Sequence, residues 1–445
     1  MATKKTYFQG IEQLVNNPEL EQFQQREFAE NLPTEAFLGE EEKLSESSTS
    51  RRDFLKYLGF STAAASLAAC EAPIQKVIPF VVKPEEIIAG NASWYASSFY
   101  DGHDFASLLI KNREGRPIFL KANDLCDKGG VTARVQASVL NLYDSARLKT
   151  PLANGEESTW ANVDANIVKG LKAAKAADKQ VVILSSSIIS PSTKAVIDAF
   201  ATKYNAKHVT YDALSASAML DANKESFGVR TLPTYHFDKA DVVVSFAADF
   251  IGDWLDAGHG KAYAVKRNLN SGTMSRHYQF ESNLSLTGAN ADYRTPVKAS
   301  EMGITLLNLY NILAKKAGVA TVNVAVSDYT TQLQKAANDL WNAKGKSLVV
   351  AGGNDKNIHI VINAINDLLS NNGTTVDFTK QSYLKQGNDA HVASLLNDMK
   401  AGKVGALIAY NANPVYNLAD GTAFAEALSK VDLSVSFATK KDETA

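Results

Sequence analysis

From about residue 160 onward, short continuous apolar runs alternate with longer segments that carry apolar residues at helical spacing. An uninterrupted apolar run such as residues 181–184 (Val-Val-Ile-Leu) is typical of a strand that is buried on both faces. The strands predicted in this way are residues 181–184, 209–211, 241–246, 348–351, 405–410 and 431–437. Strands that alternate with helices predict layered α/β domains with parallel sheets.

The segments between these strands have the pattern of amphipathic helices. Residues 160–174 repeat apolar positions at helical spacing, and residues 358–368 do so again. A third helix is predicted to begin at Ser190-Pro191, because serine is a favoured N-cap and proline is tolerated at the first helical position.

Before residue 160 the sequence no longer alternates between strand and helix patterns, and two neighbouring apolar runs are joined by a short turn. Residues 107–112 and 117–123 predict a β-hairpin, because the turn between them contains Gly115, and glycine readily adopts the positive φ of a tight turn. We therefore expect a small β subdomain over residues 93–155, followed by an α/β region over residues 156–445.

The N-terminal segment cannot build a core of its own. Residues 1–49 are polar and acidic, and we expect them to form a flexible tail. Residues 71–92 contain three spaced prolines, which favour an extended linker.

Composition excludes several functional classes. The chain of 445 residues is 45% hydrophobic and carries a formal net charge of −2, so it is neither disordered overall nor basic enough to be an evident nucleic-acid binder. Two cysteines, Cys70 and Cys126, are too few for a disulfide scaffold. They are also too few for an iron–sulfur cluster, which normally takes about four thiolates.

Candidate ligand positions follow from the predicted α/β layers, because ligands in such folds bind beyond the carboxyl ends of the strands. Small or polar residues stand there: Ser185, Asp249, Gly352 and Asn413. We take them as candidates for a nucleotide-like ligand pocket, while ordinary tight turns would use the same residue types. Neither a G-x-G-x-x-G fingerprint nor a Walker A loop is present.

Other candidate chemistry in the sequence is sparse. The seven histidines are scattered, and none stands three or four residues from another, so no helical metal-ligand pair is predicted. A buried charge network is expected to close a domain interface, with a part of the ligand pocket as the alternative. Its members would be Asp249, Asp253, Glu281, Asp292, Arg276 and Arg294.

Residues 50–70 resemble an export signal. Arg51 and Arg52 are followed by Asp-Phe-Leu-Lys and a small-residue apolar run, as in the twin-arginine signal that a translocase recognises. The run ends in Leu-Ala-Ala-Cys70, which resembles a bacterial lipoprotein box and predicts lipidation of Cys70. Such signals usually start near the first residue, whereas this one starts near residue 50.

Residues 125–129 (Leu-Cys-Asp-Lys-Gly) and 142–152 resemble the molybdopterin oxidoreductase superfamily. In that superfamily this motif supplies the fourth ligand of an N-terminal cluster, and three further cysteines precede a hairpin. Residues 94–100 stand at the corresponding place and contain no cysteine. The resemblance therefore implies molybdopterin-oxidoreductase-like parallel α/β domains, preceded by a small subdomain without its cluster. Cys126 is then the remnant of a cluster ligand. The resemblance also implies that the ligand pocket at Ser185, Asp249, Gly352 and Asn413 is the remnant of a pterin pocket, and that the charge network could be part of it.

Further strings, together with the internal twin-arginine signal, resemble the large B subunits of alternative complex III, in the group of TAT-variant-translocated molybdopterin oxidoreductases. They are residues 232–237, 247–255, 274–276, 281–294 and 413–416. The resemblance covers essentially the whole chain. Those B subunits are much longer, so the sequence is expected to be truncated within the first half.

The resemblance implies a respiratory function. The chain would be the exported scaffold half of a subunit in a quinol-oxidising complex, on the periplasmic side of the bacterial inner membrane. Electrons would pass to a periplasmic acceptor through iron–sulfur clusters in the missing C-terminal half, and no molybdenum cofactor is expected. Its partners would be other subunits of the complex and the membrane. Two alternatives stay open: an active molybdopterin oxidoreductase subunit and a lipid-anchored interaction module without a redox role.

Overall fold

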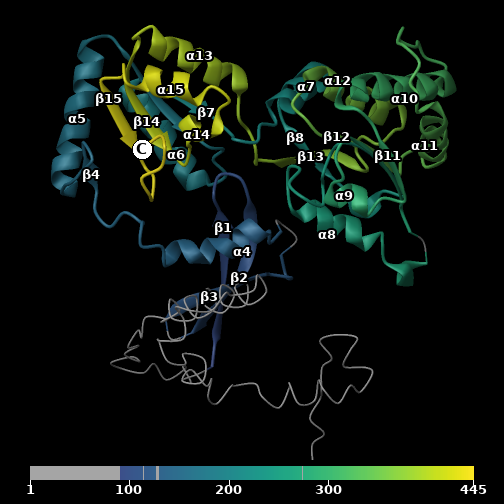
Figure 1. The fold of residues 1–445 in the computed structure, drawn as a ribbon, viewed down its shortest axis with the longest axis horizontal. Helices are drawn as coiled ribbons and strands as arrows, with labels where there is room; N and C mark the ends of the chain where they lie inside the picture. The colour runs from purple at the N-terminus through teal and green to yellow at the C-terminus, as the bar shows by residue number, and fades with distance from the viewer. Residues whose placement is uncertain (1–90, 114, 127–129, 273) are drawn as a thin grey trace, which may run out of the picture. The chain divides into compact units, whose positions relative to one another are not determined.

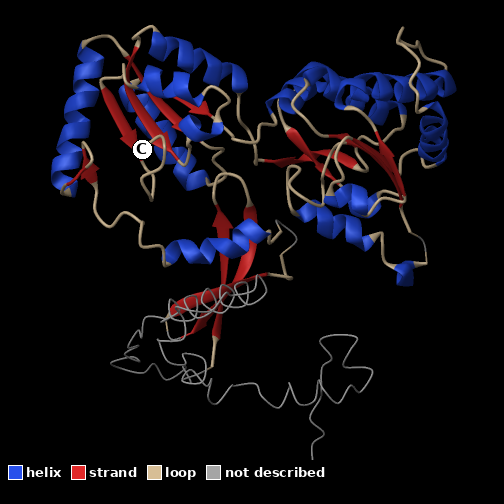
Figure 2. Ribbon diagram, viewed as in Figure 1, coloured by secondary structure: helices blue, strands red, loops and turns tan. Residues whose placement is uncertain are grey.

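The structure, a computed structural model, describes residues 91–445 except Glu114, residues 127–129 and Thr273. The predicted tail, export signal, lipidation site and linker lie outside the described residues. The described chain folds into a small antiparallel sheet and two α/β lobes, each built on its own parallel sheet (Figures 1 and 2).

The small subdomain is a three-stranded antiparallel sheet in the order β1-β2-β3. Its strands are β1 (Ser93–Tyr100), β2 (Phe105–Arg113) and β3 (Arg116–Ala122). The predicted hairpin is β2–β3, and Gly115 in its turn has φ +78°. Strand β1 was not predicted. The elements that follow are α4 (Ala133–Ala137), η3 (Ser138–Leu142), β4 (Leu152–Ala153) and β5 (Glu156–Glu157).

The first lobe contains a parallel sheet in the order β15-β14-β6-β7. Its strands are β6 (Gln180–Ser185), β7 (Lys207–Thr210), β14 (Val404–Tyr410) and β15 (Leu433–Ser436). Its helices are α5 (Trp160–Ala176), α6 (Pro191–Tyr204), α13 (Asp389–Lys400), α14 (Pro414–Asn417) and α15 (Gly421–Leu428). Helices α5 and α6 cover one face of the sheet, and α13 and α15 cover the other.

Successive residues of β6 show why this strand is an uninterrupted apolar run. Val182 and Leu184 pack towards α13 and α15, whereas Val181 and Ile183 pack towards α5 and α6. A strand with helices on both faces needs apolar side chains at every position. Helix α6 starts as predicted, because the Ser190 side chain accepts a hydrogen bond from the Thr193 N–H (3.2 Å).

The second lobe contains a parallel sheet in the order β11-β10-β9-β12, with a separate antiparallel pair β8–β13. The strands are β8 (Leu232–Tyr235), β9 (Val242–Phe246), β10 (Arg276–Glu281), β11 (Tyr293–Pro296), β12 (Ser347–Ala351) and β13 (Val376–Ser382). The α-helices are α7 (Ser217–Phe227), α8 (Gly258–Val265), α9 (Leu286–Ala289), α10 (Met302–Ala317), α11 (Thr330–Asn342) and α12 (Lys356–Leu368). Short 3₁₀ turns are η4 (Phe237–Lys239), η5 (Leu269–Ser271) and η6 (Ala299–Glu301).

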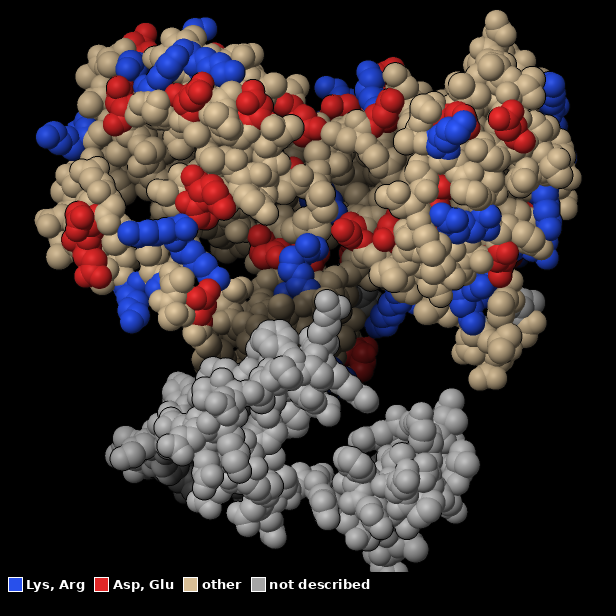
Figure 3. All heavy atoms as spheres, in the orientation of Figure 1, with Lys and Arg blue, Asp and Glu red and all other residues tan. Residues whose placement is uncertain are grey.

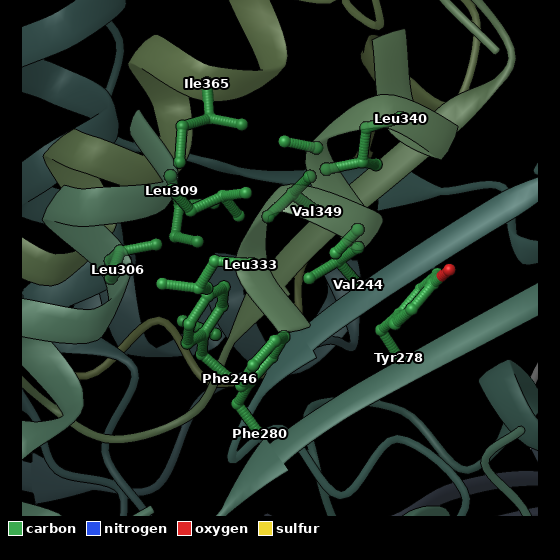
Figure 4. Packing of buried hydrophobic residues seen from close by; sticks show 14 of the residues in the cluster. Val244, Phe246, Tyr278, Phe280, Leu306, Leu309, Leu333, Leu340, Val349 and Ile365 are labelled. Atoms are coloured by element: carbon green, nitrogen blue, oxygen red, sulfur yellow. The ribbon is translucent and has the colours of Figure 1, made fainter. Parts of the chain in front are cut away.

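The largest described core lies between this sheet and helices α10, α11 and α12 (Figure 4). Phe246 and Phe280 come from adjacent strands and stack with ring centroids 5.0 Å apart. Leu309 and Leu333 reach them from the helices. The other face of the sheet packs on α8 and η4 through a second cluster of aromatic and aliphatic side chains.

The chain crosses between the lobes twice. It leaves the first lobe after β7 and returns to it between β13 and α13. The two crossings touch, because the Asn388 N–H donates to the Thr210 carbonyl (3.0 Å). No described helix is long and apolar enough to cross a membrane. Figure 3 shows acidic and basic side chains interspersed over the described part of the visible face.

Candidate functional site

The four candidate pocket residues lie at the carboxyl ends of strands, but in two different sheets. Ser185 ends β6 and Asn413 follows β14, so both belong to the first lobe. Asp249 follows β9 and Gly352 follows β12, so both belong to the second lobe. The structure therefore brings them together as two pairs rather than as one pocket.

In the first lobe, both candidates bind other parts of the chain. The fully buried Ser185 hydroxyl lies 2.8 Å from Nε2 of His208 and donates to the Ser186 carbonyl (2.7 Å). Asn413 donates from Nδ2 to a Glu443 carboxylate oxygen (2.7 Å), and its amide oxygen accepts from the Thr444 hydroxyl (2.6 Å). The polar atoms of Ser185 and Asn413 are thus paired within the protein, whereas the hydroxyl of the neighbouring residue Ser186 is buried without a hydrogen-bond partner in the described chain.

In the second lobe, the candidates fix backbone turns. One Asp249 carboxylate oxygen accepts from the Thr287 N–H (2.9 Å) at the start of α9. Gly352 lies so close to the end of β9 that a Cβ there would come 2.2 Å from the Ala247 carbonyl oxygen. Glycine is needed at this point because two backbone segments approach each other.

The prediction of one six-residue charge network is wrong, because those of its members that form ion pairs form separate ones. Glu281 accepts from Arg294 Nε (2.6 Å) and from the Ser285 hydroxyl (2.6 Å), which hold the pKa of the Glu281 carboxyl below its ordinary value against the effect of burial. The other two members with charged partners bind residues outside the set: Asp292 pairs with Arg267 and Arg276 with Asp339.

A polar junction that the sequence did not single out lies at the carboxyl end of the first-lobe sheet. The loop between β1 and β2 reaches it, and the Tyr100 hydroxyl donates to the Ser187 carbonyl (2.6 Å). Next in that loop, Gly102 has φ +92°, and a Cβ there would come 2.5 Å from the Ser186 hydroxyl and 2.7 Å from the Asn411 amide nitrogen. The loop therefore fills the space over the strand ends with backbone.

Asp212 is the central acceptor of this junction. It directly follows Tyr211 after β7 and is buried. Its carboxylate accepts from the Ser187 N–H (3.0 Å), from the Ser187 hydroxyl (2.7 Å) and from the Gly387 N–H (2.7 Å). Ser187 belongs to the first lobe and Gly387 to the second crossing, so one carboxylate joins the two.

A buried lysine stands beside Asp212. Lys385 is only 4% exposed, and its ammonium donates to the Asp253 carbonyl (3.3 Å). Burial lowers its pKa, while the nearby carboxylates of Asp104, Asp253 and Asp212 favour the charged form. The lysine is thus an internal cation among acidic side chains.

The last member of the junction is Asp104, which comes from the start of β2. Its carboxylate accepts from the Thr132 hydroxyl (2.9 Å) and from Arg134 Nε (2.9 Å), and its other oxygen lies 3.0 Å from His103 Nδ1. These contacts lower the pKa of the Asp104 carboxyl strongly, although burial opposes the shift. Asp104 therefore fastens the segment before α4 to the β1–β2 loop.

Sequence reasoning missed Asp212 and Lys385. Asp212 did carry a usable signal, because it comes directly after the predicted strand 209–211. Lys385 carried none, since it lies in a crossing segment without periodicity and its burial depends on three segments that are distant in sequence.

Some features of the junction oppose the binding of a pterin nucleotide, although the buried hydroxyls of Ser186 and Tyr211 have no hydrogen-bond partner in the described chain. Such a ligand is anionic through its phosphates and needs unoccupied donors at the strand ends. Here the carboxylates of Asp104, Asp212 and Asp253 lie near the Lys385 ammonium, and Arg134 pairs with Asp104. The donors of Ser187 and Gly387 already bind a carboxylate of the chain.

Metal ligands and the remaining cysteine give no further site in the described chain. Among its residues, no three His, Cys, Asp or Glu side chains are grouped to hold a metal ion. Cys126 is half-buried and forms no disulfide. The predicted export residues Arg51 and Arg52 and the predicted lipidation site Cys70 lie outside the described residues.

A shallow hollow of about 490 Å³ lies at the opposite end of the second-lobe sheet. Among the residues that line it are Asp241, Arg276, Asp339 and Lys346, at or near the amino ends of β9, β10 and β12. It is far from the strand ends where α/β folds place their ligands. We therefore assign no ligand to it.

Comparison with known proteins supports the fold and points to a relative. No protein-family model matches the chain. The chain is 23% identical over 451 residues to the "Menaquinone reductase, molybdopterin-binding-like subunit" of Nitratidesulfovibrio vulgaris. The aligned region covers 89% of this chain and 64% of that protein. The chain thus spans less than two thirds of the length of this curated relative.

A solved structure shows the same architecture. Acetylene hydratase from Pelobacter acetylenicus matches with a TM-score of 0.58 over 77% of this chain and 60% of its own, at 10% sequence identity. The likeness confirms the predicted fold class of parallel α/β domains. At this identity it shows the fold alone.

Proposed function

We propose that this chain is a scaffold segment, without catalysis of its own, in a subunit of a quinone-linked respiratory complex. The observation that carries the proposal is the similarity to a molybdopterin-binding-like subunit of a menaquinone reductase, which extends over 89% of the chain. The fold of the described residues is compatible with this similarity.

The contacts at the strand ends support a role without a bound pterin. Asn413 is paired with Glu443 and Thr444, and the β1–β2 loop lies against Ser186 and Asn411. The Asn413 contacts hold segments of the chain together, and the backbone of the loop occupies space over the strand ends that a ligand would need.

The finer form of the proposal is the B subunit of alternative complex III. In this form the complex oxidises quinol, and electrons pass to a periplasmic acceptor through iron–sulfur clusters outside this sequence. Two cysteines in 445 residues are too few for such a cluster. The partners would be the other subunits of the membrane complex.

Analysis of the purified protein tests the scaffold role. The full chain, produced in a bacterium that makes molybdopterin enzymes, is expected to contain no stoichiometric pterin after acid oxidation and fluorescence detection. A molybdopterin enzyme purified in parallel provides the positive control. One pterin per chain would overturn the proposal and favour an active oxidoreductase subunit. Affinity purification from the native membrane is expected to recover quinone-linked subunits, and their consistent absence would contradict the respiratory assignment.

We also propose export by the twin-arginine route and lipidation at Cys70. Changing both Arg51 and Arg52 to lysine is expected to leave the precursor in the cytoplasm, because the signal is read by a receptor and not by its charge alone. Fractionation of cells followed by immunoblotting measures this. Arg147→Lys, at an exposed position in the body of the chain, is the matched control. Unchanged secretion of the double variant would refute the export proposal.

A further inference from the structure

The distal end of the β1–β3 sheet exposes large apolar side chains. Trp94 is 46% exposed and Phe119 44% exposed. The strand register places both in one row across the sheet, with Lys111 between them. Their rings meet edge to face with centroids 6.5 Å apart. They form one exposed aromatic surface.

Apolar side chains are exposed beyond this one face. Tyr95 is the next residue along β1, so its side chain points to the opposite face, where it is 53% exposed. Ile118, the residue before Phe119, is also exposed. The exposed Tyr143 lies against the same strand, since its hydroxyl donates to the Pro117 carbonyl (2.7 Å). The subdomain core, built on Ala106, Leu108, Leu120 and Val135, includes none of these exposed side chains.

Basic residues accompany the aromatic side chains. Residues 111–121 contain four basic residues and one acidic residue, in a chain whose formal net charge is −2. The Lys111 ammonium lies 5.9 Å from the centre of the Trp94 ring, and Arg113 is exposed where β2 ends. The positive charge is therefore concentrated at the same end of the sheet as the exposed rings.

This combination fits the surface of an anionic membrane. Tryptophan and tyrosine are favoured at the level of lipid headgroups, where an apolar ring and a polar edge are both accommodated. Basic side chains are drawn to anionic headgroups, and this attraction adds to the burial of apolar area. An acidic protein surface would also attract the basic residues, but a globular partner covers one face of a sheet, whereas rings are exposed here on both.

We propose that the distal end of the β1–β3 sheet, defined by Trp94, Tyr95, Lys111, Arg113 and Phe119, docks on an anionic lipid surface. The rings enter the headgroup region, while Lys111 and Arg113 lie near the lipid phosphates. This inference goes beyond the scaffold role, because it gives the chain a membrane contact that needs neither an acyl chain on Cys70 nor a partner subunit.

Vesicle binding tests the proposal. The full chain with Cys70→Ala, which cannot be lipidated, is mixed with vesicles of phosphatidylcholine and phosphatidylglycerol or of phosphatidylcholine alone, and bound protein is sedimented. Binding to the anionic vesicles is expected, and it weakens as salt is added. Lys111→Gln together with Arg113→Gln is expected to lower the partition coefficient about 30-fold. Lys315→Gln with Lys316→Gln, in the last turn of α10, is the matched control.

A second measurement separates this surface from any other membrane contact of the chain. Trp94 fluorescence is expected to be quenched by bromine-labelled lipids in anionic vesicles, and Trp94→Phe should remove that part of the quenching. Thermal unfolding, expected to be unchanged in the variants, checks that they fold. Equal vesicle binding by all variants, or no quenching at Trp94, would overturn the proposal. Unchanged vesicle binding with loss of co-purifying subunits would assign the surface to a protein partner instead. Neither result touches the pterin analysis, so the scaffold role stands or fails separately.

Discussion

An Asp212→Ala variant is expected to lose about 3 kcal/mol of unfolding free energy. The substitution leaves the N–H groups of Ser187 and Gly387 without their acceptor, and both groups are held in the buried junction. It also removes one of the contacts between the second crossing and the first lobe. Urea unfolding followed by circular dichroism measures the loss.

Two further variants calibrate this result. Asp212→Asn keeps one acceptor oxygen and is expected to lose less stability than the alanine variant. Asp164→Ala removes an exposed carboxylate from α5 and should change the unfolding free energy by no more than about 0.5 kcal/mol. An Asp212→Ala variant as stable as Asp164→Ala would show that the junction does not depend on this carboxylate.

The second large effect is a loss of stability in mildly acidic solution, carried by His277. Its ring is buried in β10, 3.2 Å from the Tyr263 hydroxyl and 3.2 Å from the Gln279 amide oxygen. Burial lowers the pKa of His277 from 6.5 to about 4. Between these values the unfolded chain binds a proton that the folded chain does not, so stability falls as the pH drops.

The titration of His277 alone is expected to lower the free energy of unfolding by about 2 kcal/mol between pH 7 and pH 5. His277→Gln is expected to remove that part of the pH dependence, whatever its stability at pH 7. His391→Gln, at an exposed position, should keep the full dependence. Unfolding free energies measured at the two pH values give the comparison. The same slope in the His277 variant and the wild type would show that the folded protein protonates this ring readily.

The uninterrupted apolar strands were predictable, and the strands with polar positions were not. Residues 241–246 were predicted from the apolar run Val242–Val244 and Phe246, and β9 covers Val242–Phe246. Its neighbour β10 alternates apolar residues with His277, Gln279 and Glu281, and all three of these are buried. A pattern of this kind resembles a half-exposed strand, because the partners that satisfy the polar groups come from other segments.

The candidate site was predicted in part. The carboxyl ends of the strands were identified correctly, since the positions of Ser185 and Gly352 follow from strand length alone. Their separation into two sheets was not predicted, because strand order is a property of pairing and not of local pattern. The order β15-β14-β6-β7 joins segments from both ends of the α/β region.

By itself, the sequence determined the layered α/β class, the hairpin and the approximate bounds of the strands and helices with a clear apolar pattern, because these depend on periodicity and on capping or turn residues within a few positions of each other. The tertiary structure alone decided the polar junction. Asp212 and Gly387 are 175 positions apart and bind through one carboxylate. Such a contact exists only once two chain crossings lie side by side, and no local pattern records which distant donor a buried acceptor will meet.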